Sequence, residues 1–192
     1  MLAFVIFFFS VAGMIKGTIG LGLPAVSMGL LSLVISPFQA ATLLIIPSMV
    51  TNFWQLFAEG RVLRLVQRFW PLLVGMIIGS VWSVFPTLGH GEFQSEALLG
   101  GMLAIYGLYG LFAKNMPNLA PYEKYLSPIM GYLGGALTVA TGVVVIPVVP
   151  YLQSLHLKRD DLVQSLGLAF TVSTLFIAVY LHLNPVEDTP MD

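Results

Sequence analysis

Long apolar segments that are almost free of charge constrain this chain more than any other feature. Six of them cover residues 1–35, 40–57, 69–86, 96–113, 126–155 and 161–182. About 18 such residues suffice for a helix to cross a bilayer. A membrane β-barrel would instead show segments of about ten residues with alternating polarity. We therefore predict an all-α, polytopic membrane protein with one membrane domain over residues 1–192.

Composition excludes several classes of function. The net charge is −1, so the chain lacks the basic surface that nucleic acid requires. It has no cysteine, which excludes thiol–disulfide carriers, iron–sulfur sites and cysteine-ligated zinc. The three histidines have no paired helical spacing, and the segments hold no catalytic constellation. We predict no cofactor, no metal and no enzymatic activity.

We also expect residues 1–13 to be retained and not cleaved as a signal peptide, because no basic residue precedes their apolar core.

The distribution of basic residues predicts the orientation of the chain. Arg61, Arg64 and Arg68 fall in one predicted loop, Lys114 and Lys124 flank a second, and Lys158 and Arg159 form a third. The loop near residue 90 and the C-terminal tail contain neither Lys nor Arg. Since basic loops face the cytoplasm, these three loops are expected on that side.

The segment 126–155 is then bounded by cytoplasmic loops at both ends. It must cross the membrane an even number of times, or enter and return. Thirty residues of straight helix would span about 45 Å, which is too long for one untilted crossing. Gly142, Pro147 and Pro150 provide a break. We expect a re-entrant pair of short helices at this place.

Shifting the chain on itself by 122 residues indicates an internal repeat. Gly13 then meets Gly135, Gly20 meets Gly142, and the pair Thr51–Asn52 meets Ser173–Thr174. Both units begin with a broken segment and continue into a long helix with a hydroxyl pair near its end. We assign residues 1–113 to repeat 1, with a re-entrant pair and three spans, and 126–182 to a partial repeat 2.

Three spans are an odd number, so the second repeat should start on the opposite side and be inverted. Inverted repeats with discontinuous helices are typical of secondary transporters, which hold substrate near the midplane. By analogy with residues 69–113, two more helices are expected after residue 182.

The two breaks form the candidate substrate site. Gly20, Gly22 and Pro24 interrupt the first segment, and Thr141, Gly142 and Pro147 interrupt the second. Glycine permits non-helical backbone, and proline suits the first turn of a new helix. Both breaks would direct free N–H groups toward an anion. The glycines alone are equally compatible with close helix packing.

Lys16 is the only charged residue in the interior of a predicted span. A lysine at that depth costs about 2.5–3.5 kcal/mol on insertion scales, so it indicates function unless it snorkels to an aqueous surface. Asn52 and Gln164 are costly to bury and are stronger candidates than single threonines, whose hydroxyls bond to their own helix. The candidate substrate-binding residues are Lys16, Thr18, Gly20, Gly22, Thr51, Asn52, Thr141, Gly142, Gln164 and Thr174.

The stretches "AGMIKGTIGLGLPAVSMGLLSLV", "QAATLLIIPSMVTNFWQL", "PLLVGMIIGS" and "ATGVVVIPVVPYLQSLHLKRDDLVQSLGLAFTVSTL" resemble the TauE/SafE sulfite exporter family. The resemblance covers nearly the whole chain. It implies a multi-pass transporter of sulfite, sulfonates or related sulfur anions in the bacterial inner membrane. It also implies two four-helix halves of inverted topology, whereas this chain stops before the last two helices.

The leading hypothesis is an anion transporter that works by alternating access, with the anion held between the two breaks. The expected partners are the small anion and the lipid bilayer, with no nucleic acid. A passive anion channel and a non-transporting subunit of a membrane assembly remain alternatives. The oligomeric state, including a homo-oligomer, stays open.

Overall fold

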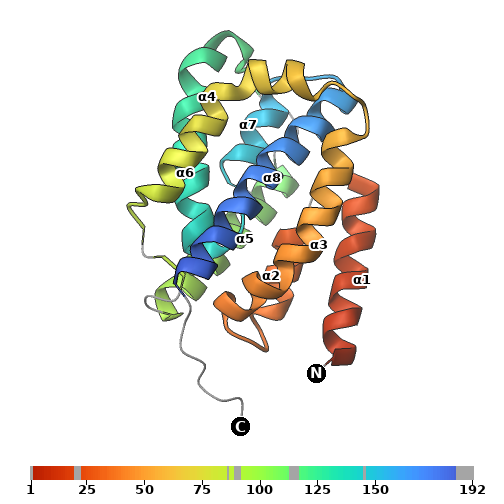
Figure 1. Ribbon diagram of the computed structural model, residues 1–192, viewed down its shortest axis with the longest axis vertical. Helices are drawn as coiled ribbons and strands as arrows, with labels where there is room; N and C mark the ends of the chain where they lie inside the picture. The colour runs from red at the N-terminus through yellow and green to blue at the C-terminus, as the bar shows by residue number, and fades with distance from the viewer. Residues whose placement is uncertain are drawn as a thin grey trace.

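The computed structural model describes residues 2–19, 23–85, 87–88, 92–112, 117–144 and 146–184. All regular elements in these ranges are helices (Figure 1). They are α1 (Leu2–Ile19), α2 (Leu23–Leu31), α3 (Pro37–Phe57), α4 (Val62–Val81), α5 (Glu92–Phe112), the 3₁₀ turn η1 (Ala120–Tyr122), α6 (Glu123–Thr141), α7 (Val148–Ser154) and α8 (Arg159–Leu183). The predicted all-α class is confirmed for the described part of the chain.

Three helices are long and apolar enough to cross a membrane, namely α3, α4 and α8. Shorter apolar stretches, Phe7–Gly17 in α1 and Glu96–Leu111 in α5, complete the set found among the described residues. Large apolar side chains such as Trp54, Ile46 and Leu63 are exposed on the outside of the bundle. An apolar exterior of this kind is suited to lipid, which agrees with the prediction of a membrane protein.

Both segments predicted to be broken consist of two helices. The first is divided into α1 and α2, and Pro24 lies in the first turn of α2 as expected. The second is divided into α6 and α7, and α6 ends at Thr141 with Gly142 as its C-cap, whose φ of 76° is left-handed. Gly20 and Gly22 lie outside the described residues. That either pair turns back within the membrane stays a prediction.

The predicted boundaries of two helices were wrong. α4 begins at Val62 and not at residue 69, so Arg64 and Arg68 lie on its first turns rather than in a loop. α6 begins at Glu123, so Lys124 is helical as well. On α4, Leu65 and Phe69 are buried while Arg64 and Arg68 are exposed. An amphipathic first turn of this kind extends a helix beyond its apolar run.

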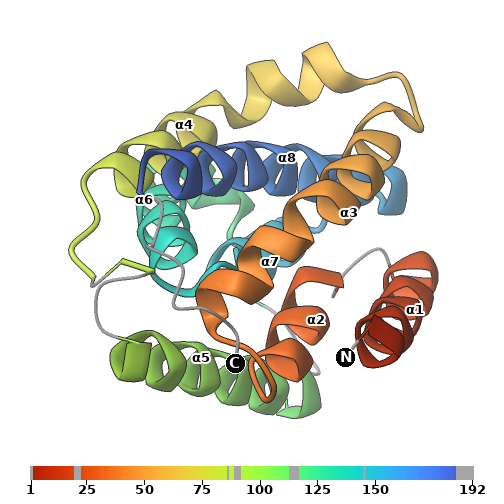
Figure 2. The ribbon, with the colours of Figure 1, turned by 60° about the horizontal axis from the view of Figure 1, so that its bottom comes forward.

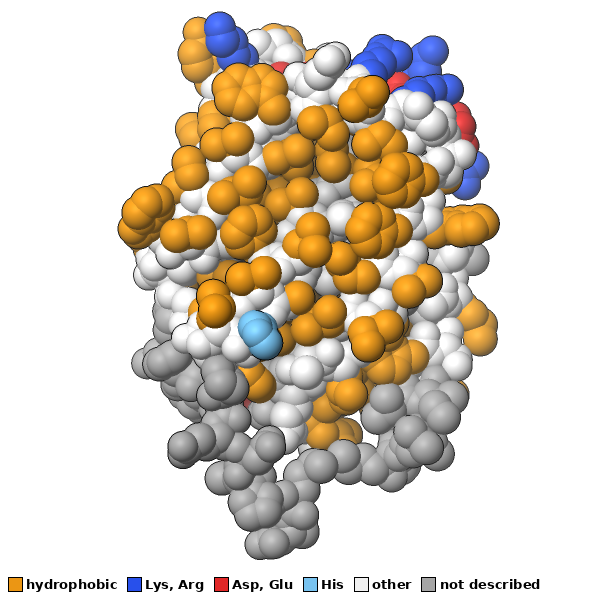
Figure 3. Space-filling model, in the orientation of Figure 1, with side chains coloured by type: hydrophobic (Ala, Val, Ile, Leu, Met, Phe, Trp, Pro, Cys, Tyr) orange, Lys and Arg blue, Asp and Glu red, His pale blue; other side chains and the backbone are white. Residues whose placement is uncertain are grey.

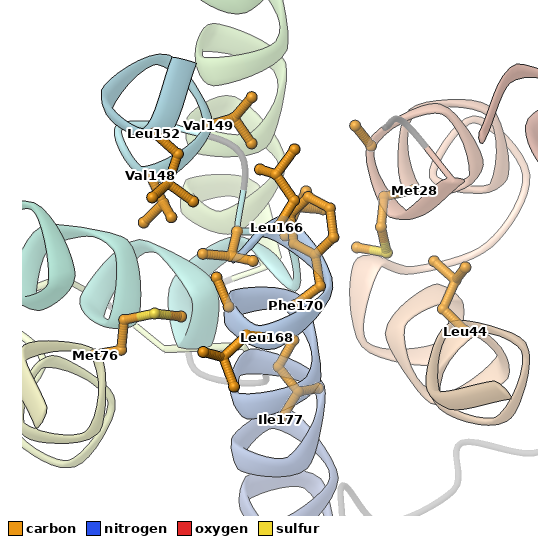
Figure 4. Close-up of a cluster of buried hydrophobic side chains, with 14 of the residues drawn as sticks. Met28, Leu44, Met76, Val148, Val149, Leu152, Leu166, Leu168, Phe170 and Ile177 are labelled. Atoms are coloured by element: carbon orange, nitrogen blue, oxygen red, sulfur yellow. The ribbon is translucent and has the colours of Figure 1, made fainter. Parts of the chain in front are cut away.

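The core is centred on α8, which contacts α3, α4, α6 and α7 (Figure 2). Leu166, Phe170 and Ile177 of α8 belong to one buried cluster with Met28 of α2 and Leu44 of α3 (Figure 4). Most side chains between Asp161 and Thr174 are buried, so the helix is enclosed on nearly all sides. A helix apolar around its whole circumference is expected in such a position.

Glycines bring α4 and α6 into close contact. A Cβ added to Gly79 would lie 2.0 Å from the Tyr132 carbonyl oxygen, and one on Gly135 would lie 2.0 Å from that of Met76. Small residues serve the same purpose in membrane helix interfaces generally. Glycine at these positions therefore allows the backbones of α4 and α6 to pack closely.

Charged residues gather at one end of the bundle (Figure 3). Arg61 Nη1 donates to Asp161 Oδ1 at 2.9 Å, and Arg68 Nη2 donates to Glu123 Oε2 at 2.7 Å. These ion pairs join the starts of α4, α6 and α8, and the hydrogen bond to Asp161 raises the pKa of Arg61. Arg61, Lys124 and Lys158 therefore belong to one end, and the cytoplasmic assignment of that end stays a prediction.

Candidate functional site

Lys16 on α1 is buried, with 7% of its surface exposed, and it points at α3. Its Nζ donates to Thr51 Oγ1 at 2.8 Å and to Asn52 Oδ1. Asn52 is fully buried, and its Nδ2 donates to Thr174 Oγ1 of α8 at 3.2 Å. A continuous chain of hydrogen bonds therefore runs from α1 through α3 to α8.

The charge of Lys16 is held by neutral groups. Within the described ranges it has no carboxylate at ion-pair distance, and both ion pairs lie at the charged end of the bundle. The face of the Phe170 ring is 5.8 Å from Nζ, within the range of a cation–π contact. Since buried charges are normally paired, a lysine in this setting favours the approach of an anion.

A small pocket lies next to this chain of hydrogen bonds. Its volume is about 20 Å³, enough for about one water molecule. Helix α3 contributes Ser48 to the wall, α8 contributes Phe170, Ser173 and Thr174, and the two interrupted segments contribute Pro24 and Gly142. The structure thus brings both breaks to a single pocket.

Lys16 stands beside the pocket rather than in its wall. Two residues connect them: Phe170, whose ring faces Nζ, and Thr174, which accepts the hydrogen bond from Asn52. The lysine charge therefore reaches the pocket across one layer of side chains.

Gly142 could not be replaced by another residue without strain. Its φ of 76° is in the left-handed region, and an added Cβ would lie 2.8 Å from Met28 Cε. Thr141 donates to the Leu137 carbonyl at 2.7 Å, so its hydroxyl is bonded to its own helix. Thr51 and Thr174 also donate to carbonyls four residues earlier, while accepting from Lys16 and Asn52 respectively.

Gln164 lies away from the pocket wall. Its Nε2 donates to the Leu56 carbonyl at 2.8 Å, and Gln55 Nε2 donates to the Val163 carbonyl at the same distance. The two glutamines therefore form reciprocal side-chain bonds between α3 and α8. These two hydrogen bonds hold α3 against α8.

Of the predicted site residues, the structure joins Lys16, Thr51, Asn52 and Thr174, and places Gly142 in the pocket wall. The side chain of Thr18 lies outside the part that the structure describes, as do Gly20 and Gly22. Sequence reasoning did not select Ser48, Ser173 or Phe170 as site residues. Ser48 is one helical turn before Asn52, a spacing that places both on one face of α3.

Here interrupted helices meet at a small pocket whose mainly apolar wall includes three hydroxyl side chains. Interrupted helices in a bundle with membrane-length helices are typical of membrane transport proteins. The family model for the sulfite exporter TauE/SafE matches residues 4–188, and the chain belongs to that family. No curated protein and no solved structure matches the chain. The family is one of sulfite exporters, so membership indicates membrane transport of sulfur anions.

Proposed function

We propose that this chain transports sulfite or a short sulfonate across the bacterial inner membrane by alternating access. The observation that carries the proposal is Lys16, a buried lysine whose hydrogen-bond partners among the described residues are neutral, beside a pocket between two interrupted helices. A divalent or monovalent sulfur oxyanion would provide the missing negative charge. The family match supports the substrate class.

In the proposed site the anion occupies an enlarged form of the pocket near the midplane. Backbone N–H groups at the start of α2, together with Thr18, Gly20 and Gly22, would approach it from the first break. Thr141 and Gly142 would approach from the second break, while Thr51, Asn52, Gln164 and Thr174 line the route between α3 and α8. Lys16 supplies the positive charge.

Residues 1–113 and 126–182 would act as inverted repeats. α3 ends and α8 begins at the charged end of the bundle, where Arg61 is paired with Asp161. The two long helices that follow the breaks therefore run in opposite directions, as inversion requires. Rocking of one repeat against the other would expose the pocket to each side in turn.

The size of the pocket favours a carrier over a passive channel. A volume of about 20 Å³ suits one water molecule, whereas sulfite has four heavy atoms. For the anion to occupy this pocket the helices would have to separate, so a conformational change would accompany each passage.

The test is flux of labelled sulfite and of short sulfonates into proteoliposomes that contain the purified full chain. A carrier should show saturation and should accelerate exchange when unlabelled anion is present on the opposite side. Saturable uptake without counterflow would identify a passive path. Flux equal to that of empty liposomes for all these anions would contradict the proposed function, and a stable partner chain would then indicate an assembly subunit.

A further inference from the structure

Ser48 differs from most hydroxyl residues of α3 and α8 because its side chain makes no hydrogen bond among the described residues. A serine or threonine within a helix usually donates to the carbonyl four residues earlier. Thr51 donates to Pro47, Ser165 to Asp161, and Thr174 to Phe170 in this way. Ser48 Oγ has no hydrogen-bond partner among the described residues, although only 2% of the residue is exposed.

The position of Ser48 distinguishes it from the other buried hydroxyls without a partner. Ser27 and Ser32 also lack one, but neither contributes to the pocket wall. Ser48 does line the pocket, as does Ser173 from α8 on the other side. A buried donor without a partner is unfavourable, so a group that enters the pocket and accepts its hydrogen bond would be stabilised.

Ser48 also lies close in sequence to the residues that hold Lys16. Thr51 and Asn52 follow it by three and four positions and therefore share its face of α3. An anion oxygen in the pocket would thus meet a hydroxyl from α3 on the same face that carries the lysine contacts. Apolar residues such as Leu44 and Ile177 form other parts of the wall and offer no competing hydrogen bond.

We propose that Ser48 is a substrate-binding residue, whose hydroxyl donates a hydrogen bond to an oxygen of the sulfur oxyanion in the pocket. This inference rests on the proposed function and adds to it a residue of the binding site. Substrate binding replaces the missing partner of Ser48 and thereby converts an unfavourable buried hydroxyl into a charge-assisted hydrogen bond.

The experiment compares Ser48→Ala with Ser165→Ala in the full chain, by sulfite flux in proteoliposomes and by thermal unfolding in detergent. Both serines are 2% exposed, but Ser165 is bonded to its own helix and lies outside the pocket. Ser48→Ala should raise the KM for sulfite about tenfold and leave the unfolding temperature unchanged or slightly higher. Ser165→Ala should lower the unfolding temperature and leave KM unchanged.

A second measurement separates binding from transport. Sulfite should raise the unfolding temperature of the wild-type protein in detergent, and this increase should shrink in Ser48→Ala. An unchanged KM and an unchanged sulfite-induced increase in Ser48→Ala would overturn the inference. If Ser48→Ala showed these unchanged values and also unfolded at a lower temperature than the wild type, Ser48 would be a structural hydroxyl that binds an internal water.

Measurements on the wild-type protein distinguish failure of the Ser48 inference from failure of the proposed transport function. Sulfite-induced stabilisation without any flux would contradict transport, while the comparison of unfolding temperatures would still decide the role of Ser48. A wild-type protein with neither flux nor stabilisation by sulfite would overturn both proposals.

Discussion

Asn52 Nδ2 lies 3.2 Å from Thr174 Oγ1, and the two residues are 122 positions apart. The same shift of 122 residues aligns the two broken segments in the sequence. Two equivalent positions of a pseudo-two-fold structure touch each other only where they lie next to its axis. The contact therefore supports an axis that passes between α3 and α8 and beside the pocket, which strengthens the proposal of inverted repeats.

Replacement of Lys16 by glutamine should weaken anion transport sharply. The glutamine amide would keep a hydrogen bond to the α3 polar groups but would remove the buried charge, so the KM for sulfite should rise at least about tenfold. The measurement is sulfite uptake as a function of concentration in proteoliposomes. Gel filtration in detergent should show an unchanged elution volume. If KM stayed at its wild-type value, Lys16 would have a structural role only.

Asn52→Leu should destabilise the bundle, because it removes the side chain that bonds to both Lys16 and Thr174. Loss of these bonds from fully buried groups is expected to cost about 1–3 kcal/mol. The unfolding temperature in detergent measures the effect. Thr171→Val is the control, because Thr171 bonds only to the Gly167 carbonyl of its own helix. An equal decrease in both variants would show that the chain of hydrogen bonds adds no stability.

Gly79→Ala should separate α4 from α6. The new methyl group would lie 2.0 Å from the Tyr132 carbonyl oxygen, so the backbones must move apart at a cost of about 1–3 kcal/mol. Gly107→Ala on α5 is the matched control, because no atom lies within 4 Å of the added Cβ. The control should be neutral or slightly stabilising, since alanine favours helix. Equal unfolding temperatures for the two variants would contradict the close contact.

The orientation can be tested with single cysteines, because the native chain contains none. Glu59→Cys and Asn118→Cys are at exposed positions next to the charged end, and Val84→Cys is exposed just after α4. In intact bacterial spheroplasts, an impermeant maleimide should label only the variant at position 84. The other two should react in inside-out vesicles. The opposite pattern would reverse the predicted topology.

Much of the fold could be predicted because helix interruptions and membrane-length apolar runs are local properties. Pro24 and Gly142 mark where helices start and end, and the structure places them as expected. The early start of α4 was missed because a long apolar run does not mark the amphipathic turns that precede it. In those turns Arg68 is exposed and is paired with Glu123 of α6.

Several residues of the candidate site could be selected from the sequence, but the contacts between them could not. Lys16 and Asn52 were selected because they are costly to bury, and this reasoning requires no knowledge of their neighbours. That they contact each other across 36 positions depends on how α1 packs on α3. Ser48 was not found, because a missing hydrogen-bond partner becomes visible only when the surrounding atoms are placed.

The charge of Lys16, which no carboxylate of the described residues pairs, has a consequence for the energetics of the proposed transport in a living cell. With its proton retained, the empty site carries one positive charge inside the membrane, and a monovalent anion would cancel it. Each elementary charge that moves across 100 mV changes the free energy by about 2.3 kcal/mol. The membrane voltage would therefore act on the return of the empty carrier and leave the loaded carrier nearly unaffected, so that voltage sets the direction in which the protein resets.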